Sequence, residues 1–495
     1  MRHELSKSTF MRGLKCEKCL YLNKHHHHLR DKLTSEQEAI FEQGTNVGEL
    51  AQQLHPGGEN FTPVSYYDFG PSIKATKQAI AKGTPVIYEA AFLFNGVLVA
   101  MDILVKSPKG YKAFEVKSST SVKDTYVKDA ALQAYVIRNS GVSLEDVSIV
   151  YLNKKYKRAG NLDITQLFKT ESIWDQIIPL MDTIPEKIEK FKTLLKSSNA
   201  PQKDIGLHCQ QPYSCDFMGH CWENVPVYSV FDINNLNVNK RFDLYHSGCT
   251  TLDQIPADYP LSANQRLQVQ SEINQTVHIE KEAIASFLSE LNYPIYHIDF
   301  ETMSHAVPQF DGATPYGPIV FQYSMHIQEN IQSVPIHKEF IGDGNKNDPR
   351  RKFAEKLILD SGTHGDVLVY NIGFERGKLN ALISLFPDLS AGLQAIINRM
   401  KDLMVPFQSK WYYTPEMKGS HSLKYVFPAV APDFEYSYSG LTIQNGSTAS
   451  LVYSQMVTGT YKGDYDQAQL DLLEYCKLDT LAMVKLLEKL YLVSK

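Results

Sequence analysis

The stretch TPVIYEAAFLFNGVLVAMDILVKSPKGYKAFEVK, residues 84–117, decides the fold of the first half of the chain. It holds three runs of apolar, β-branched and aromatic residues, separated by Asn-Gly at 95–96 and Pro-Lys-Gly at 108–110. Such turn residues favour tight hairpins, so the pattern predicts an antiparallel meander. Helical spacing follows at 121–139, and the apolar run at 146–153 predicts another strand. An α/β core with helical flanks is therefore expected.

Charged residues interrupt this meander in a pattern that suits metal-dependent hydrolysis. Asp102 ends the second run, while Glu115 and Lys117 stand two residues apart in the third, so their side chains share one face. Two acids can hold a divalent ion, and a lysine can position the attacking water and offset phosphate charge. Glu89, in the first run, is a further candidate carboxylate, with a solvated strand residue as the equal alternative.

These residues resemble the core of the PD-(D/E)XK nucleases, and in particular their RecB-like members. The resemblance implies that Asp102 and Glu115 bind the metal and that a glutamine in the next helix contacts the substrate. Gln133 and Tyr135 form Gln-x-Tyr where the family more often has Gln-x-x-x-Tyr, so Gln133 is the preferred candidate. A second departure is Gly48 in GTNVGELA, at the place where RecB-like nucleases often supply a histidine ligand.

The cysteines fall into groups rather than spreading along the chain. Of the seven, five stand in two sets, Cys16-x2-Cys19 and Cys209-x5-Cys215-x5-Cys221. In a reducing compartment this grouping indicates a metal or cluster site. The split set resembles the one-plus-three arrangement of iron–sulfur RecB-like nucleases, which implies that Cys16, Cys209, Cys215 and Cys221 bind a 4Fe–4S cluster, with Cys19 spare. A structural zinc site is the alternative. Two further cysteines are expected to be ordinary buried thiols: Cys249 and Cys476.

A second α/β pattern begins near residue 293. Three strand-like runs, YPIYHIDFET, FQYSMHIQ and IHKEFIG, precede an expected helix near 349–360. The apolar run DVLVYNI predicts a further strand, followed by a helix from about residue 375. Three strands, a helix and another strand indicate the opening of a mixed-sheet domain.

Acidic residues recur in this second half at three separate places. Asp299 and Glu301 lie two apart in a strand-like run, so both carboxylates leave the same face. Glu375 follows a predicted strand, in the spacing Asn-x-x-Phe-Glu. Near the C-terminus, Tyr475 and Asp479 lie four apart in an amphipathic helix and hence on one side of it. Clustered carboxylates select hard cations such as Mg²⁺ or Mn²⁺.

The motifs IDFET, NIGFE and YCKLD resemble the three exonuclease motifs of the DEDD family, in its tyrosine subtype. The resemblance implies a ribonuclease H-like sheet and hydrolysis of nucleic acid from the 3′ end with two metal ions. Asp299, Glu301 and Asp479 would then be metal ligands, and Tyr475 would orient the attacking water. Glu375 stands where the family usually has aspartate. Two further residues are candidates either for lining the cleft or for ordinary loop roles: Asp402 and His421.

Composition and spacing together predict an α/β protein of several domains. Apolar residues make up 43% and charged residues 21%, as in ordinary folded proteins. The expected domains are a RecB-like nuclease with its cysteine clasp at 1–228, a helical connector at 229–288 and an exonuclease domain at 289–495. The connector resembles a helix-hairpin-helix unit, with a mere spacer as the alternative. No apolar run is long enough to span a membrane, so a cytoplasmic location is expected.

The combined order resembles a bacterial family of RecB-like proteins fused to exonuclease-like domains. It implies a DNA nuclease in repair or defence that acts on single strands or duplex ends. The net charge of −5 requires local basic clefts for such binding. One alternative is an RNA-directed 3′–5′ exonuclease with an inactive N-terminal domain. Another, suggested by Gly48 and Glu375, is a nucleic-acid-binding scaffold with degenerate sites.

Overall fold

The computed structural model describes residues 3–434 and 440–495, which form two compact units. Unit 1 comprises Met1–Asn224 and His305–Tyr316, and unit 2 comprises Val225–Ser304 and Gly317–Lys495. Each unit has its own mixed sheet and many helices, so the α/β multidomain class is confirmed. The segment 229–288, predicted as a separate connector, belongs to unit 2, and the transfer of 305–316 to unit 1 had no counterpart in the sequence pattern.

The sheet of unit 1 has seven strands, ordered β2-β3-β4-β5-β6-β7 with β1 paired to β4. The strands β3, β4 and β5 are antiparallel neighbours, which confirms the predicted meander, and β6 runs parallel to β5. The strands are β1 Leu5–Ser6, β2 Glu59–Asn60, β3 Val86–Phe94, β4 Val97–Ser107, β5 Gly110–Lys117, β6 Leu144–Leu152 and β7 Phe168–Ser172.

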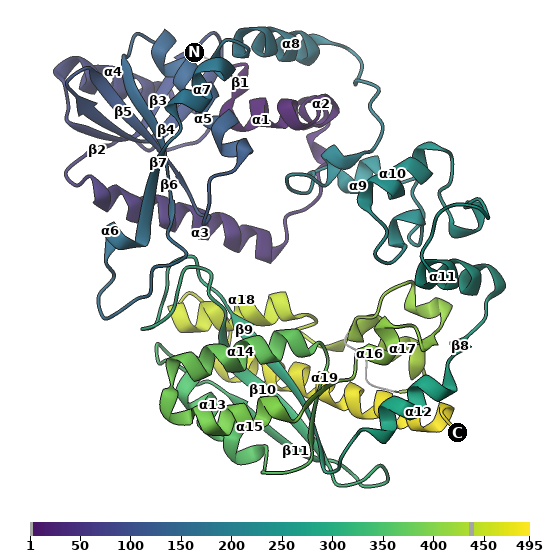
Figure 1. Ribbon diagram of the computed structural model, residues 1–495. Coiled ribbons are helices and arrows are strands. Elements are labelled where there is room, and N and C mark those ends of the chain that lie inside the picture. The colour runs from purple at the N-terminus through teal and green to yellow at the C-terminus, as the bar shows by residue number, and fades with distance from the viewer. Residues whose placement is uncertain (1–2, 435–439) are drawn as a thin grey trace. The chain divides into compact units, whose positions relative to one another are not determined.

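Helices enclose two apolar cores against this sheet. Buried residues of α5 and α8, such as Leu132 and Phe191, belong to one core, and Val47 and Ala51 of α3 belong to the other. Figure 1 shows α3 running along the sheet as one long helix. The helices are α1 Lys7–Lys15, α2 Glu17–His25, α3 Ser35–Ala51, α4 Gly70–Lys82, α5 Asp124–Asn139, α6 Ile164–Leu167, α7 Trp174–Met181, α8 Ile184–Lys196 and α9 Met218–Cys221.

Glu89 interrupts the regular alternation of β3. Its φ of 53° lies in the left-handed region, which residues with a Cβ rarely adopt. Ile87 before it and Ala90 after it belong to the same core, although residues three apart in a strand normally face opposite sides. In the register Glu89 falls between two ladder pairs, opposite Asp102. A backbone irregularity therefore coincides with a candidate site residue, where such strain is commonly found.

The principal sheet of unit 2 has five strands, ordered β11-β10-β9-β12-β13. The strand β9 is antiparallel to β10 and parallel to β12, so the predicted mixed sheet is confirmed. A separate pair, β8 with β14, is antiparallel. The strands are β8 His278–Ile279, β9 Ile295–Met303, β10 Ile319–Gln328, β11 Ile336–Ile341, β12 Asp366–Val369, β13 Met400–Asp402 and β14 Tyr412–Tyr413.

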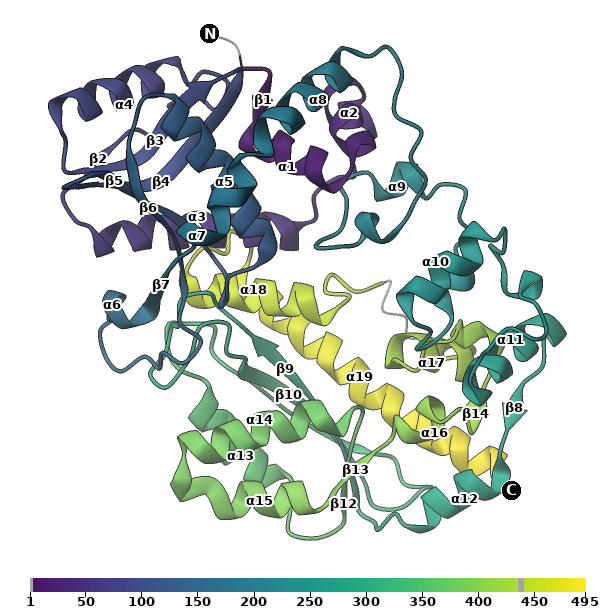
Figure 2. The ribbon, with the colours of Figure 1, turned by 45° about the horizontal axis from the view of Figure 1, so that its top comes forward.

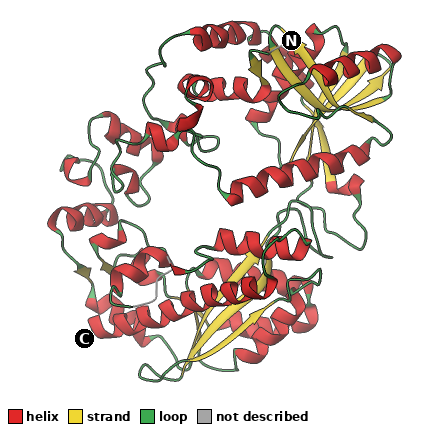
Figure 3. Cartoon of the chain, turned by 180° about the vertical axis from the view of Figure 1, so that it is seen from behind, coloured by secondary structure: helices red, strands yellow, loops and turns green. Residues whose placement is uncertain are grey.

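Helices cover both faces of this five-stranded sheet. On one face α13, α14 and α15 pack on residues such as Ile298 and Phe300, and the long helix α19 lies along the other (Figures 2 and 3). Gln322 on β10 donates to the Leu472 carbonyl of α19 at 2.7 Å. The helices are α10 Val238–His246, α11 Ala263–Asn274, α12 Lys281–Ser289, α13 Arg350–Asp360, α14 Ile372–Leu385, α15 Ser390–Asn398, α16 Val405–Gln408, α17 Leu423–Val430, α18 Gly446–Thr458 and α19 Tyr465–Val493.

Membrane-spanning helices are not found in the described part of the chain. Within residues 3–434 and 440–495, none of the helices combines the length and the apolar character that crossing a bilayer requires.

Gly110, at the tight turn into β5, offers a test of this fold. Its φ is 139°, and a Cβ there would lie 2.3 Å from the Ser143 carbonyl oxygen. Gly110→Ala is expected to lower the free energy of unfolding by about 1–3 kcal/mol, because the backbone must shift. Gly48→Ala is the matched control, since that helical position has open space around it and alanine favours helix. Urea unfolding measures both, and equal stabilities of the two variants would contradict the prediction.

Candidate active sites

The candidate site of unit 1 brings together charged side chains from β4, β5 and α5. Lys117 Nζ lies 2.7 Å from Glu115 Oε1. Gln133 donates to Glu115 Oε2 at 2.7 Å, and Asp102 accepts the backbone N–H of Val116 at 2.6 Å. Glu115 and Gln133 are buried, and Asp102 is half-buried. The structure therefore brings four residues singled out in the sequence into one cluster.

Two residues of this cluster were not identified from the sequence. Lys7, at the start of α1, places Nζ 2.8 Å from Glu115 Oε1, and Asp129 accepts from Lys117 Nζ at 2.7 Å. Asp129 lies four residues before Gln133 on the same helix, and that spacing was a usable signal. Lys7 gave no local signal, because 108 residues separate it from Glu115.

The charges of this cluster are unevenly balanced. Burial raises the pKa of Glu115, but the ammonium groups of Lys117 and Lys7 outweigh it and lower the pKa to about 2. Burial, followed by the charge of Glu115, raises the pKa of Asp102 and raises that of Glu89 to about 7. Glu115 is therefore held ionised by lysines, whereas the ionised forms of Asp102 and Glu89 are disfavoured. A bound divalent cation would favour those ionised forms.

The two positions that depart from the RecB-like pattern, Tyr135 and Gly48, have different surroundings in the structure. Tyr135 packs against Phe94, with ring centroids 5.9 Å apart. Gly48 lies in α3 with open space around its Cα, so no side chain occupies the histidine position. Its neighbour Glu49 is close enough to Glu89 to raise the pKa of that carboxyl, after the larger effects of burial and Glu115. The charge of Glu49 on α3 therefore acts on the site, one residue beyond the position expected for a histidine.

The grouped cysteines of unit 1 line one small cavity. It is bordered by Cys16, Cys19, Cys209, Cys215 and Cys221, and by Phe217 and Met218. All five cysteines are free thiols. Cys16 precedes α2, and Cys19 follows within that helix, with its thiol close to Cys215. Four thiolates suit an iron–sulfur cluster or zinc, so the donor set fits both groups. Both N-terminal cysteines reach the cavity, and the choice of Cys16 over Cys19 stays a prediction.

Salt bridges tie the two cysteine groups together. Asp216, next to Cys215, pairs with Arg12 of α1 and lies 3.3 Å from Arg30. The backbone N–H of Asp31 donates to the Asp216 carbonyl at 2.8 Å. Because Arg12 and Asp216 are 204 residues apart, these contacts close the two ends of unit 1 on each other.

The candidate site of unit 2 lies where β9 meets α19. Asp299 and Glu301 leave the same face of β9, and Tyr475 and Asp479 lie one turn apart on α19. The ligand oxygens of Asp299 and Glu301 lie within 4.8 Å of each other and of the Cys476 sulfur. Glu301, Tyr475 and Asp479 are buried. The helix packs along the strand, which holds both pairs in place.

Burial is the largest electrostatic effect at this site, and repulsion between its acids adds to it. Burial raises the pKa of Asp299, and the charge of Asp479 raises it further. Burial also raises the pKa of Glu301, helped by Asp299 and Asp479. For Glu375, burial and then the charge of Asp299 raise the pKa to about 9. Asp299, Glu301 and Glu375 are thus each close enough to another acid for its charge to disfavour their ionised forms, and with Asp479 these carboxylates lie in one region.

Glu375 is held toward this region by the start of α14. Asp402, at the end of β13, accepts the backbone N–H groups of Asn371 at 3.1 Å and Ile372 at 3.0 Å. Asn371 has a φ of 84°, which turns the chain into the helix. Glu375 is 1% exposed, and its Oε2 has no hydrogen-bond partner among the described residues. Asp402 therefore positions the helix that carries Glu375, and the unpaired oxygen suits a cation ligand.

Two further residues of this site were not identified as functional from the sequence. Lys424, on α17, lies 5.2 Å from the Tyr475 ring centroid. Burial lowers the pKa of Lys424, while Asp479, Glu301 and Asp299 oppose that shift. Cys476, expected as an ordinary buried thiol, is fully buried but lies 3.7 Å from Asp299 Oδ2. His421 lies instead in a neighbouring cavity, 3.1 Å from Asn234 Nδ2.

Comparisons with known proteins match part of the chain. A family model described as a domain of unknown function, DUF2779, matches residues 296–422. That segment contains Asp299, Glu301 and Glu375 and ends before Asp479. The chain is similar to an uncharacterized protein of Mycoplasma pneumoniae, with 25% identity over 217 residues, covering 38% of this chain and 31% of the relative. It is also similar to an uncharacterized protein of Ureaplasma parvum, with 25% identity over 234 residues, covering 43% and 33%. The chain spans about a third of the length of these curated relatives.

The raised pKa of Glu375 predicts a pH-dependent stability. Its pKa in the folded chain, about 9, lies above the ordinary value of 4.5, so the folded state binds more protons between these limits and stability falls as pH rises. In metal-free protein, Glu375→Gln is therefore expected to unfold at a higher temperature than wild type at pH 8, and the difference should vanish near pH 4.5.

The control for this measurement is Glu355→Gln on α13, whose side chain is 49% exposed and should give no such pH dependence. Saturating Mn²⁺ should stabilise wild type more than the Glu375→Gln variant, because the carboxylate is a better ligand than the amide. The unfolding temperature of wild type and of both variants is measured at pH 8 and near pH 4.5. If metal-free wild type is more stable than Glu375→Gln at pH 8, the raised pKa of Glu375 is contradicted.

Proposed function

We propose that the chain is a metal-dependent nuclease that hydrolyses phosphodiester bonds of DNA. Unit 2 would act as a DEDD-type 3′–5′ exonuclease on a ribonuclease H-like sheet, and unit 1 as a RecB-like PD-(D/E)XK nuclease. The observation that carries the proposal is the convergence of Asp299, Glu301, Glu375 and Asp479 beside Tyr475, each in the place of a motif residue. DNA repair or defence against foreign DNA fits this chemistry.

The donors of unit 2 suit hard divalent cations. Carboxylate oxygens are the ligands that Mg²⁺ and Mn²⁺ prefer, and the unpartnered Glu375 Oε2 offers one more. Asp299, Glu301, Glu375 and Asp479 would hold the ions. When bound, a pair of such ions lowers the pKa of a water and stabilises the leaving 3′-oxygen.

Protein groups beside the carboxylates have their own tasks in this proposal. Burial, and then the charge of Asp479, raises the pKa of Tyr475, so its phenol stays protonated and can donate a hydrogen bond to the attacking water. Lys424, beside the Tyr475 ring, would meet the negative charge of the phosphate. No nucleophilic side chain is needed, because water is the nucleophile.

In unit 1 the same chemistry would be shared between acids and lysines. Asp102 and Glu115 would hold the cation, with Glu89 as a further donor. Lys117 contacts Glu115 and Asp129 and would orient the water, while Gln133 fixes the second oxygen of Glu115. The five cysteines fit a 4Fe–4S cluster that would clasp the ends of this unit.

A cleavage assay on the full chain tests the proposal. Anaerobically purified protein is incubated with Mg²⁺ or Mn²⁺ and with DNA or RNA labelled at the 3′ or 5′ end. Asp299→Ala is expected to slow release of 3′-terminal nucleotides on the order of 100-fold or more, and Lys117→Ala to remove the cleavage due to unit 1. The matched controls Asp388→Ala and Lys190→Ala, with exposed side chains, should retain activity.

Each outcome of this assay has a defined meaning. The protein could cleave RNA but not DNA, with the activity lost in Asp299→Ala and retained in Lys117→Ala. That result would replace the proposal by an RNA-directed exonuclease with an inactive unit 1. Absence of any cleavage by wild type would contradict the nuclease function and leave a nucleic-acid-binding scaffold.

The cluster is tested separately by metal content. Anaerobically purified protein is expected to be brown and to contain about four iron and four sulfide ions per chain. Cys209→Ser should lower the iron content, whereas Cys249→Ser should not, since that thiol contacts the Gln254 carbonyl outside the cysteine cavity. Cys16→Ser and Cys19→Ser, compared side by side, identify the fourth ligand. Zinc in place of iron would overturn the iron–sulfur assignment.

A further inference from the structure

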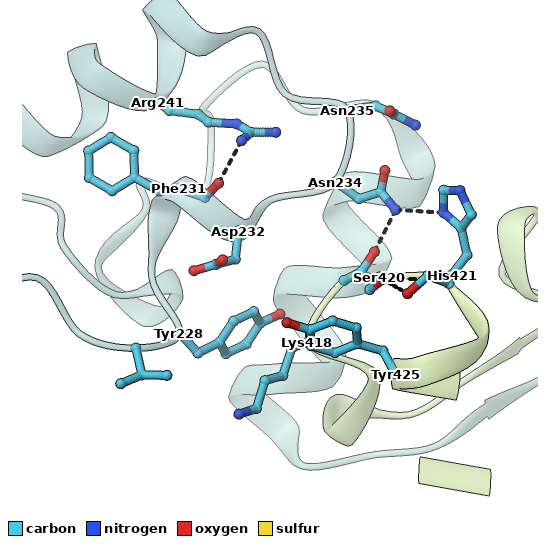
Figure 4. Close-up of a pocket in the computed structure, with 13 residues that line it drawn as sticks. Tyr228, Phe231, Asp232, Asn234, Asn235, Arg241, Lys418, Ser420, His421 and Tyr425 are labelled. Atoms are coloured by element: carbon cyan, nitrogen blue, oxygen red, sulfur yellow. Dashed lines mark hydrogen bonds between the residues drawn. The ribbon is translucent and has the colours of Figure 1, made fainter. Parts of the chain in front are cut away.

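A second polar cavity lies in unit 2, with a volume of about 460 Å³. Its walls come from the segment 227–241, before and within α10, and from residues 418–425 at the start of α17 (Figure 4). The size is that of pockets for small organic ligands, which range over about 300–1,000 Å³. None of the motifs described above accounts for it.

The lining of the cavity combines aromatic surface with hydrogen-bonding groups. Tyr228, Phe231 and Tyr425 contribute rings, and Tyr425 is 48% exposed. Asn234 donates to the Gly419 carbonyl and contacts His421 Nδ1, as Figure 4 shows. With Nδ1 accepting, a neutral His421 carries its proton on Nε2, which can donate to a ligand.

The charge of the cavity favours an anionic ligand. Lys418 lines it as a cation, and Arg241 does so with a guanidinium that donates to the Phe231 and Ile233 carbonyls at 2.7 and 2.9 Å. Asp232 is the acid of the lining, and its carboxylate already accepts the Ser229 N–H at 2.8 Å and hydroxyl at 3.1 Å. Lys418 has a φ of 48°, and such strained backbone is common where a ligand is held. Aromatic rings beside cations and hydrogen-bond donors are the features that bind unpaired nucleotides.

Consecutive residues at the start of α17 belong to this cavity and to the surroundings of the carboxylate site. Tyr425 lines the cavity, whereas the preceding residue, Lys424, lies beside the Tyr475 ring and acts on the charges of Asp299 and Glu301. The start of α17 therefore borders both the carboxylate site and this cavity.

We propose that this cavity binds one unpaired nucleotide of the single-stranded DNA substrate, upstream of the 3′-terminal bond that is cut. Its base stacks on Tyr425, and its phosphate is met by Lys418. The inference rests on the proposed function of unit 2 and adds a substrate subsite to it. The subsite makes the enzyme prefer strands with at least one stacked nucleotide next to the scissile position.

The test uses the full chain carrying Asp299→Asn, with a 5′-fluorescein 12-mer DNA that bears one abasic position moved stepwise from the 3′ end. With Tyr425 intact, fluorescence anisotropy is expected to show that one abasic oligomer binds about 10-fold more weakly than the unmodified oligomer. Adding Tyr425→Ala should weaken the unmodified oligomer by a similar factor and abolish that positional effect, and Tyr425→Phe should restore both. Lys418→Ala should weaken all oligomers equally and reduce the salt dependence of binding.

Controls separate this inference from the proposed function. Tyr461→Ala and Lys346→Ala, elsewhere in unit 2, should leave affinity unchanged. If the wild-type chain cleaves DNA but the abasic effect survives Tyr425→Ala, the subsite is wrong and the nuclease proposal stands. If the chain neither binds nor cleaves DNA, the nuclease proposal itself fails. In the wild-type background, Tyr425→Ala should raise KM and retain kcat, and the reverse would overturn the subsite.

Discussion

Repulsion between buried carboxylates is the constraint around which unit 2 is organised. Asp299 and Glu301 on β9 lie near Asp479 on α19, whose charge raises the pKa of both after the larger effect of burial. Such an arrangement persists only when the surrounding fold holds it. Ser324 and Thr480 share a hydrogen bond of 2.7 Å between β10 and α19, which fixes the helix against the sheet. The binding of a cation would repay the electrostatic cost that this rigid packing imposes.

Unit 1 meets the same electrostatic problem in a different way. Glu115 contacts Lys117 and Lys7, and its pKa falls to about 2, so this carboxylate is ionised and compensated within the protein. The pKa values of Asp102 and Glu89 are instead raised, first by burial and then by the charge of Glu115.

Local patterns carried most of the information that could be read from the sequence. The Asn-Gly hairpin, the alternation of β4 and β5 and the four-residue spacing of Tyr475 and Asp479 each follow from short-range geometry, and the structure contains them. The placement of Ile87 and Ala90 in one core, on either side of Glu89, could not be predicted, because a left-handed residue inside a strand leaves no compositional trace.

Contacts between distant segments could not be predicted in this way. Lys7 meets Glu115 across 108 residues, and Lys424 joins the acids of β9 and α19 from a helix whose sequence has no motif. Residue spacing specifies which side chains share an element, but the packing of elements decides which charges become neighbours. For that reason most of the carboxylates, and Lys117 on the strand of Glu115, were identifiable from the sequence, whereas Lys7 and Lys424 were not.

The segment His305–Tyr316 leaves unit 2 between β9 and β10 and folds with unit 1. There Arg158 donates to the Pro308 and Gln309 carbonyls at 3.0 and 2.9 Å, and Ala306 joins an apolar core. A chain cut after Asn224 would remove residues 305–316 from unit 1. In the remaining part, the same segment would lose the contacts that it makes with unit 1. Separating the two units at that boundary is therefore expected to destabilise both of them, because the segment crosses from one to the other.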